Sequence, residues 1–377
     1  MAQKRSIFEE VGETRREAPA AAPKATDTGA ARRAIAAWLK VLFVLVVVMI
    51  AVGGLTRLTD SGLSITEWRP VTGALPPLSA EAWEAEFEKY RAIPEYQLQN
   101  RGMSMAEFKV IYWWEWGHRQ LGRVIGLVWG VGFLWFLLRG QIPRGWTPRL
   151  LGLGALGGLQ GAIGWWMVSS GLTGTMLDVA SYRLATHLGL AFVILGLIAW
   201  YVLRLGRDEV DILQARRQRQ GGLVTLTSVM VPLLFVQILL GALVAGIDAG
   251  RTYVDWPLMS GQFLPPDPFY IEPVWSNFFE NAGLVQFNHR MLAYAVFLFG
   301  LFVWWRARGS ALAQVRLAFG WMMLALALQV VLGIITVLYV APWHLAIGHQ
   351  FLAVLLWVAL LRARFEASYP RAQSVRA

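Results

Sequence analysis

Long apolar segments separated by shorter polar ones dominate the chain. The hydrocarbon core of a bilayer requires about 20 predominantly apolar residues per crossing helix. Eight segments satisfy this requirement, and they lie near 35–56, 118–138, 149–169, 184–204, 222–246, 288–306, 315–340 and 344–362. The pattern therefore predicts an all-α membrane protein with eight transmembrane helices.

Composition and charge agree with a membrane location. Only 15% of the residues are charged, whereas soluble domains contain about 25%. The formal net charge of +10 does not indicate nucleic-acid binding, because Lys and Arg gather in the two tails and in the loops after the second, fourth and sixth spans. Basic loops stay in the cytoplasm. We expect both termini on the cytoplasmic side of a bacterial inner membrane, in contact with lipid and not with nucleic acid.

Polar segments divide the chain into expected regions. Residues 1–34 lack the apolar core of a signal peptide, and Glu9, Glu10, Glu13 and Glu17 are unlike the acid-poor composition of a mitochondrial transit peptide. We expect a disordered cytoplasmic tail at 1–34, a four-helix bundle at 35–206 with a long outer loop at 57–117, a basic cytoplasmic linker at 207–221, a second four-helix bundle at 222–365 and a cytoplasmic tail at 366–377.

The two halves repeat an ordered series of residues. Gly53-Gly54-Leu55, Asp60, Gly62 and Trp68 recur 188 positions later as Gly241-Ala242-Leu243, Asp248, Gly250 and Trp256. The further matches are His118-Arg119 with His289-Arg290, Gln160 and Gly164 with Gln329 and Gly333, and His187 with His349. An internal repeat with an even number of spans predicts two parallel, pseudo-symmetric four-helix bundles.

Four of the five histidines fall at these repeated positions, at the outer ends of even-numbered spans. Polar rings within a membrane are usually functional, and imidazoles on facing helices of a four-helix bundle are suited to axial ligation of heme iron. We predict one heme per half. The chain has no Cys, so thiolate ligation and iron–sulfur clusters are excluded. Zinc, with its three or four clustered ligands, fits poorly. His344 has no repeat partner, and we interpret it as structural.

One acidic residue distinguishes the halves. Ser104-Met105-Ala106-Glu107 matches a capping box that would begin a helix running into the second span. Glu115 and His118 would share a face of that helix, whereas the residue matching Glu115 in the second half is Gln286. A carboxylate can move protons, so we expect catalysis in the first half and electron transfer in the second, unless Glu115 only pairs with Arg119 at the surface. The candidate partners for heme propionates are Arg119, Arg123, Arg290, Arg57 and Arg183.

These motifs resemble those of the heme A synthases. The matching segments are Gly53 to Ser64, Glu67-Trp68-Arg69-Pro70, Glu115-Trp116-Gly117-His118-Arg119, Phe287-Asn288-His289-Arg290 and Gly348-His349-Gln350. The resemblance covers about residues 35–365. Some bacterial members carry cysteine pairs in their outer loops, so this chain is similar to the cysteine-free branch of alphaproteobacteria and mitochondria, and a mechanism that needs a loop disulfide is excluded.

The resemblance implies an oxidoreductase that converts heme O to heme A by oxidising the methyl group on porphyrin carbon C8 to a formyl group, in successive steps. It implies that His118 and His187 hold the substrate heme, that His289 and His349 hold a heme b cofactor, and that Glu115 is the catalytic carboxylate. Such an enzyme supplies heme A for cytochrome c oxidase assembly, with the heme sites toward the periplasm. Heme O synthase, oxidase assembly factors and an electron donor that the sequence does not identify are the expected partners, and a homo-oligomer is compatible with the sequence.

Two other functions remain open at this stage. A bis-His diheme b-type cytochrome that only transfers electrons would also need four histidines and eight spans, but it would not need Glu115 in one half alone. A transporter or heme chaperone would share the internal repeat. Such proteins usually have broken helices and acids near the bilayer midplane, and these spans are largely unbroken and nearly free of acids.

Overall fold

The computed structural model describes residues 28–174 and 176–371, and helices account for the regular structure of this part. No β-strand occurs within these ranges, where Met259 and Gln262 form an isolated bridge. The predictions for residues 1–27 and 372–377 lie outside the described residues. The all-helical fold class is confirmed.

Eight helices of the described part are long and apolar enough to cross a membrane. They are α1 (Thr28–Leu58), α4 (Met105–Leu138), α5 (Thr147–Val168), α6 (Ser181–Leu205), α8 (Gly221–Gly246), α10 (Ala282–Arg308), α11 (Ala313–Leu338) and α12 (Trp343–Ser368). The number of predicted spans is thus confirmed, and every predicted span falls largely within one of these helices.

Helix ends differ from the predicted boundaries where polar residues continue a helix. Thr28 begins α1 and Ser368 ends α12, so residues 28–34 and 366–368 are helical and not part of irregular tails. The predicted linker 207–221 contains a short helix, α7 (Glu209–Arg217). The capping box is confirmed: Ser104 and Glu107 bond each other's backbone N–H groups, which satisfies two donors at the start of α4.

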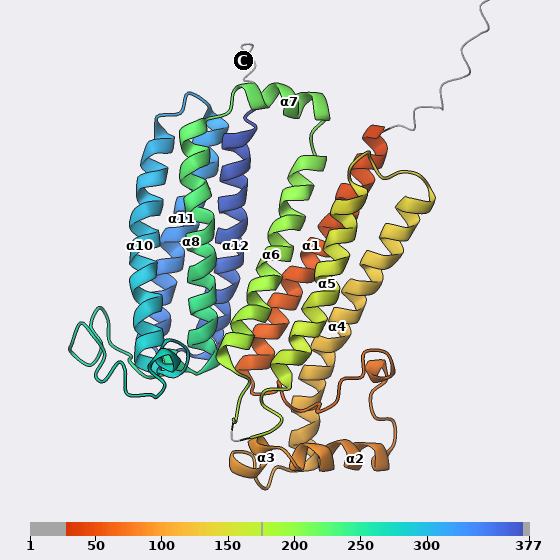
Figure 1. Cartoon of the computed structure of the whole chain (residues 1–377), viewed down its shortest axis with the longest axis vertical. Coiled ribbons are helices and arrows are strands. Elements are labelled where there is room, and N and C mark those ends of the chain that lie inside the picture. Colours follow the sequence, from red (N-terminus) through yellow and green to blue (C-terminus); the bar gives the residue numbers. More distant parts are fainter. Residues whose placement is uncertain (1–27, 175, 372–377) are drawn as a thin grey trace, which may run out of the picture.

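The long helices form two groups of four (Figure 1). In the first group α1 packs against α4 and α6, and α5 packs against α4 and α6. In the second group α8 packs against α10 and α12, and α11 packs against α10 and α12. The same order of contacts is what two copies of a four-helix unit would give, although a pseudo-symmetry between the groups stays a prediction. The groups meet where α6 contacts α8 and α12, and where α1 contacts α12.

The long loops lie together at one end of the bundle, below the helices in Figure 1. The loop after α1 contains α2 (Ala80–Arg91) and α3 (Pro94–Leu98). The loop after α8 contains two 3₁₀-helices, η2 (Ala249–Arg251) and η3 (Val274–Ser276), and the short helix α9 (Asn277–Glu280). The opposite end carries α7 and the short basic connections. All four predicted heme-ligand histidines lie nearer the long-loop end.

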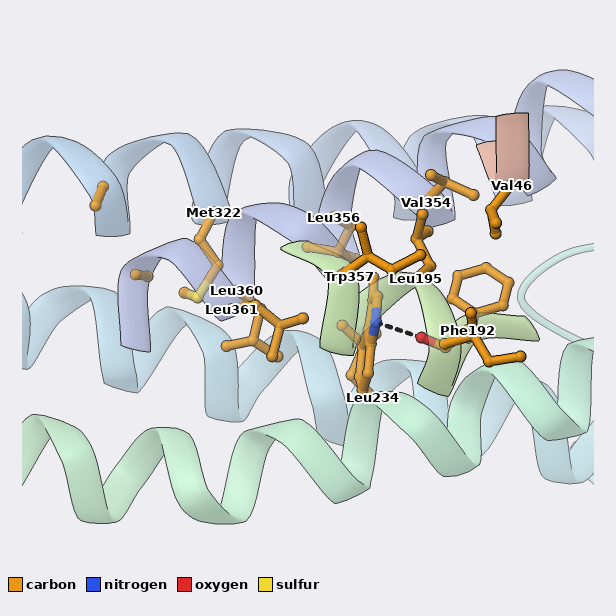
Figure 2. Close-up of a cluster of buried hydrophobic side chains, with 14 of the residues drawn as sticks. Val46, Phe192, Leu195, Leu234, Met322, Val354, Leu356, Trp357, Leu360 and Leu361 are labelled. Carbon is orange, nitrogen blue, oxygen red and sulfur yellow. Dashed lines mark hydrogen bonds between the residues drawn. The ribbon is translucent and has the colours of Figure 1, made fainter. Parts of the chain in front are cut away.

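Apolar side chains fill the contact between the two groups. Figure 2 shows Phe192 and Leu195 of α6, Leu234 of α8 and Trp357 of α12 packed together. Trp357 is buried and donates its indole N–H to the backbone carbonyl of Phe192 over 3.0 Å. This hydrogen bond satisfies the polar atom of a large side chain that otherwise makes apolar contacts.

Glycines make room for hydrogen bonds between a Trp indole N–H and a backbone carbonyl of a neighbouring helix. Trp38 bonds the carbonyl of Val128 over 3.0 Å, and a Cβ on Gly132 would lie 2.2 Å from the indole nitrogen of Trp38. In the same way, the indole of Trp357 bonds the carbonyl of Phe192 and lies against Gly196, four residues later. A helical side chain covers the turn before its own Cα, so a glycine four residues after a carbonyl leaves that oxygen open to a donor from the next helix.

Candidate functional site

The four repeated histidines lie on four helices, at corresponding depths. His187, His289 and His349 lie about two turns from the N-terminal ends of α6, α10 and α12. His118 lies further along α4, because that helix is 34 residues long and extends toward the outer loops. All four rings are partly buried. All four thus lie toward the long-loop end of their helices, and the side of the membrane that this end faces stays a prediction.

Each histidine ring lies against a glycine of the preceding long helix. The distances from an ideal glycine Cβ to the nearest ring atom are 3.3 Å for Gly53 and His118, 2.8 Å for Gly164 and His187, 3.1 Å for Gly241 and His289, and 2.9 Å for Gly333 and His349. Real Cβ atoms seldom approach so closely. Glycine at these four positions is thus a consequence of ring placement and not only of helix–helix packing.

Three of the histidines also have a glutamine partner. The pairs are Gln160 with His187, Gln237 with His289 and Gln329 with His349. In every pair the amide nitrogen donates to the backbone carbonyl of the histidine over 3.0 Å and lies 3.0–3.4 Å from both nitrogens of its ring. The three amide oxygens are buried without a hydrogen-bond partner among the described residues.

The rings of His289 and His349 lie with their centres 6.5 Å apart and their planes at 77°. Two metal–nitrogen bonds of about 2 Å, with the distance from each nitrogen to its own ring centre, bring such centres to about 6 Å. The spacing therefore fits two axial imidazoles on one iron. In the other bundle, His118 and His187 lie on α4 and α6, which both pack against α1 and α5.

Glu115 is buried beside the first histidine pair, with 3% of its surface exposed. One oxygen accepts hydrogen bonds from the Ser64 hydroxyl over 2.7 Å and the Ile65 backbone N–H over 2.8 Å. The other oxygen accepts from Arg119 at 2.5 and 3.1 Å. The interpretation of Glu115 as only a surface partner of Arg119 is therefore wrong, because the outer loop covers the pair.

Arg119 and Arg290 hold the outer loops by the same kind of contact. Arg119 donates to the backbone carbonyls of Ile65 and Glu67 over 2.8 and 3.1 Å. Arg290 donates to those of Tyr253 and Asp255 over 2.9 Å. Tyr253 and Asp255 follow Ile65 and Glu67 by 188 positions, as Asp248 follows Asp60.

Gln286 and Tyr253 match Glu115 and Ile65, and they also form a hydrogen bond, but here the side chain is the donor and not the acceptor. Gln286 is buried, and its amide donates to the carbonyl of Tyr253 over 3.0 Å. Glu115, by contrast, accepts from the N–H of Ile65. Both side chains thus fasten a loop to a helix, but only the first half does so with an ionisable group.

The other three arginines predicted to bind propionates also contact protein groups. Arg123 donates to the carbonyls of Arg69 and Pro70 over 2.9 Å, and Arg183 donates to the carbonyl of Trp166 over 2.6 Å. The binding of propionates by any of the five arginines stays a prediction.

Arg57 joins the two halves. Its guanidinium lies 2.9 Å from Asp60, 3.4 Å from Asp178 and 2.9 Å from Asp248 of the second loop, with 12% of the side chain exposed. Burial raises the pKa of Asp178, and the positive charge of Arg57 opposes that rise. The residue matching Arg57 in the second half is Ala245, so one cation serves carboxylates from both halves.

A second buried acid, which the sequence did not identify, lies in the first loop. Glu95 of α3 has 3% of its surface exposed, and its Oε2 has no hydrogen-bond partner among the described residues. Burial raises the pKa of Glu95 to about 8, and the nearby carboxylates Asp178, Glu115 and Asp60 add to the rise. Glu95 therefore holds a proton near neutral pH.

The remaining histidine lies apart from these pairs. His344 is exposed at the start of α12, next to Trp343, and its interpretation as structural stays a prediction. Residues 28–174 and 176–371 contain no group of three or more His, Asp or Glu side chains that could hold a metal ion. The pairs of imidazoles are thus the candidate metal centres of the described chain.

Comparisons with known proteins now give the family. A sequence model of the family described as cytochrome oxidase assembly protein matches residues 36–361. The chain belongs to this family. It is similar to a protein of Dinoroseobacter shibae named heme A synthase, with 66% identity over 100% of this chain and 99% of that one. Proteins of the same name from Ruegeria pomeroyi and Roseobacter denitrificans are 63% and 61% identical over the full length of both chains. The resemblance to heme A synthases is confirmed.

Membership of the cytochrome oxidase assembly family, together with the eight apolar helices, identifies an integral membrane protein. Sequence reasoning missed Gln237, Ser64 and Glu95. The spacing of Gln237 could have identified it from the sequence, because it precedes Gly241 by four residues, as Gln160 precedes Gly164. Ser64 and Glu95 have none, because their contacts depend on how the outer loop folds over α4.

Proposed function

We propose that this protein is an oxidoreductase that converts heme O to heme A by oxidising the C8 methyl group of the porphyrin to a formyl group. Its similarity to proteins named heme A synthase over their full length supports this function. The structural observation that carries the proposal is the buried carboxylate of Glu115, one helical turn before His118 and absent from the corresponding place beside His289.

The first histidine pair is the proposed substrate site. His118 and His187 would bind the iron of heme O, and Glu115 would hold or accept a proton as the methyl carbon loses hydrogen. Ser64, Ile65 and Arg119 fix the position of that carboxylate. The outer loop excludes water from it, which strengthens its electrostatic effect on the reacting group.

Small residues on the surfaces of α4 and α5, where Gly126, Gly157 and Gly161 are exposed, support the same assignment. A Cβ on Gly126, Gly130, Gly157 or Gly161 would meet no atom within 4 Å. The matching positions of α10 and α11, aligned on His289 and Gln329, carry larger residues: Phe297, Leu301, Leu326 and Val330. The contact between α4 and α5 is also less extensive than that between α10 and α11. A substrate that enters and a product that leaves need such room, and the prenyl tail of heme O is large and apolar.

The second pair, His289 and His349, would hold a permanent heme b. Bis-His heme supplies one-electron transfer, and the protein contributes orientation, ligation and restricted access. The glutamine partners of both histidines suit a cofactor that stays bound. We also propose that the basic end with α7 faces the cytoplasm, that both heme sites lie toward the periplasm of the bacterial inner membrane, and that heme O synthase and oxidase assembly factors are the partners.

Co-expression with heme O synthase in a host that makes no heme A tests the function. Chromatography of the extracted hemes should show heme A with the wild-type chain. With Glu115→Gln, heme A formation should fall at least about 100-fold, the scale of a lost acid–base group, while the protein still binds two hemes. Gln286→Glu, the matched change in the second half, should leave heme A formation close to wild type.

Two results would contradict the proposal. Normal heme A formation with Glu115→Gln would remove this carboxylate from the mechanism. Two bound hemes that are never converted by the wild-type chain would instead favour the diheme b-type cytochrome.

A further inference from the structure

The surroundings of His118 differ from those of the other three histidines. Each partner glutamine precedes the glycine beneath its histidine by four residues, so the two lie on one helix face. The residue four positions before Gly53 is Met49. The Cε of Met49 lies 3.6 Å from an ideal Cβ on Gly122, which follows His118 by four residues. Met49 thus reaches the place where a glutamine would contact the carbonyl of His118.

The residues beside the other three histidines indicate that Met49 occupies the position that a glutamine occupies at those sites. The residues four positions after them are alanines: Ala191, Ala293 and Ala353. A side chain at this position covers the histidine carbonyl, and a methyl group still lets the glutamine amide reach it, over 3.0 Å. Beside His118, Gly122 leaves even more room for a donor, but the thioether of Met49 carries no N–H.

The ring of His118 is consequently held by packing alone. In the described part of the chain no hydrogen bond reaches either of its ring nitrogens, whereas Gln237 lies 3.0 Å from Nδ1 of His289. The ring also turns a different edge to its glycine: Nε2 and Cδ2 face Gly53, but Cε1 and Nδ1 of His289 face Gly241.

Partners of this kind determine how firmly a histidine binds a metal. The hydrogen bond made by the second ring nitrogen fixes the tautomer and orientation of a ligating imidazole, and its loss typically weakens metal binding about 10–100-fold. The amide nitrogen of each of the three glutamines lies within 3.4 Å of both nitrogens of its histidine ring, and the amide oxygen has no hydrogen-bond partner in the described residues. Each amide can therefore orient the ring and still carries an unused acceptor. His118 has no such acceptor.

We propose that Gln160, Gln237 and Gln329 are positioning residues that lock three of the four heme ligands, and that Met49 leaves His118 as the one ligand that detaches from iron. The inference rests on the proposed function. It gives the first site a fixed ligand, His187, and a releasable one on the side of Glu115, which suits a heme that must enter, react and leave. Both ligands of the second site are locked, as a permanent cofactor requires.

Carbon monoxide binding to the dithionite-reduced protein tests this proposal, because the gas binds heme iron only where an axial ligand has left. The full chain is co-expressed with heme O synthase and purified with its hemes. We expect one of the two hemes of the wild-type protein to bind carbon monoxide. In Met49→Gln the association rate at that heme should fall at least tenfold. Gln329→Met should make the second heme reactive as well.

Met49→Leu is the matched control, since leucine fills the site but bonds nothing, and its reaction should match wild type. An unchanged association rate in Met49→Gln, or an unreactive second heme in Gln329→Met, would overturn the proposal while leaving the heme sites intact. A purified wild-type protein without Soret absorbance would overturn both this inference and the proposed function. The Soret spectrum thus separates the two failures.

Discussion

The two outer loops are fastened to their bundles by matching residues, with one chemical difference. Arg119 and Arg290 bind loop carbonyls at corresponding positions, and Glu115 and Gln286 each bond the residue at the centre of that contact. In the second half a donating amide stands where the first half has an accepting carboxylate. A loop can therefore be fastened at this position without an ionisable group, which favours a chemical role for Glu115.

The same comparison extends to side-chain size along the helices that carry the histidines and the glutamines. The first half has glycines where the second has Phe297, Leu301, Leu326 and Val330, and Met49 where the other three sites have glutamine. Each difference makes the first site looser. Under the proposed function, the first half would exchange its heme and the second would keep it, on a shared arrangement of helices.

The largest effect should come from filling the contact beneath a histidine. A Cβ at position 333 would lie 2.9 Å from Cε1 of His349, and one at position 164 would lie 2.8 Å from Cε1 of His187. Gly333→Ala should displace the second ring and remove that heme, whereas Gly164→Ala should remove the first. Heme per protein, measured by absorbance, should fall by about half in each variant. Loss of both hemes from either single variant would show that the sites are not independent.

A smaller effect should follow when the first half receives the bulk of the second. Gly157→Leu with Gly161→Val introduces the residues found at Leu326 and Val330. We expect heme A formation to fall about tenfold, since one or two methylene groups already change binding by about 1–3 kcal/mol, while the second heme stays bound. Gly152→Ala, near the start of α5, serves as the control, since a Cβ at this position would meet no atom within 4 Å. Wild-type heme A formation in the double variant would refute the assignment of this space to the substrate.

The smallest effect concerns the pH dependence of stability. The folded protein raises the pKa of Glu95 from 4.5 to about 8, so it retains a proton that the unfolded chain releases. Stability should therefore fall as pH rises from about 4.5 to about 8, by at most about 4 kcal/mol. Thermal unfolding in detergent at pH 5 and pH 8 should show this loss in wild type and a weaker one in Glu95→Gln. Glu88→Gln, which replaces an exposed acid, is the control. If Glu95→Gln lost as much stability between pH 5 and pH 8 as Glu88→Gln, Glu95 would be excluded as the cause.

The sequence predicted the helices and the histidines because their signals are local. Apolar length revealed the eight spans, the Ser104–Glu107 pattern revealed the start of α4, and the repeat revealed the four histidines. It did not reveal α2 and α3, whose short amphipathic patterns lie inside a mixed-charge loop, nor α7 within a segment interpreted as a linker.

Contacts between segments distant in the sequence could not be predicted, for a physical reason. The bond between Glu115 and Ile65, the ion pairs of Arg57 and the burial of Glu95 depend on how loops fold over helices, and no spacing rule encodes that geometry. The partnership of Gln237 with His289 lies between these cases. Its spacing from Gly241 was visible, but its meaning required the position of the ring.

The measurement that tests the central claim most directly is the heme content of the purified protein. Two pairs of imidazoles, one per bundle, should bind two hemes per chain. Replacing His289 and His349 together by alanine should leave one heme, and replacing His118 and His187 should leave the other. A wild-type protein without a Soret band, or a protein that keeps both hemes after His289 and His349 are replaced, would contradict the account.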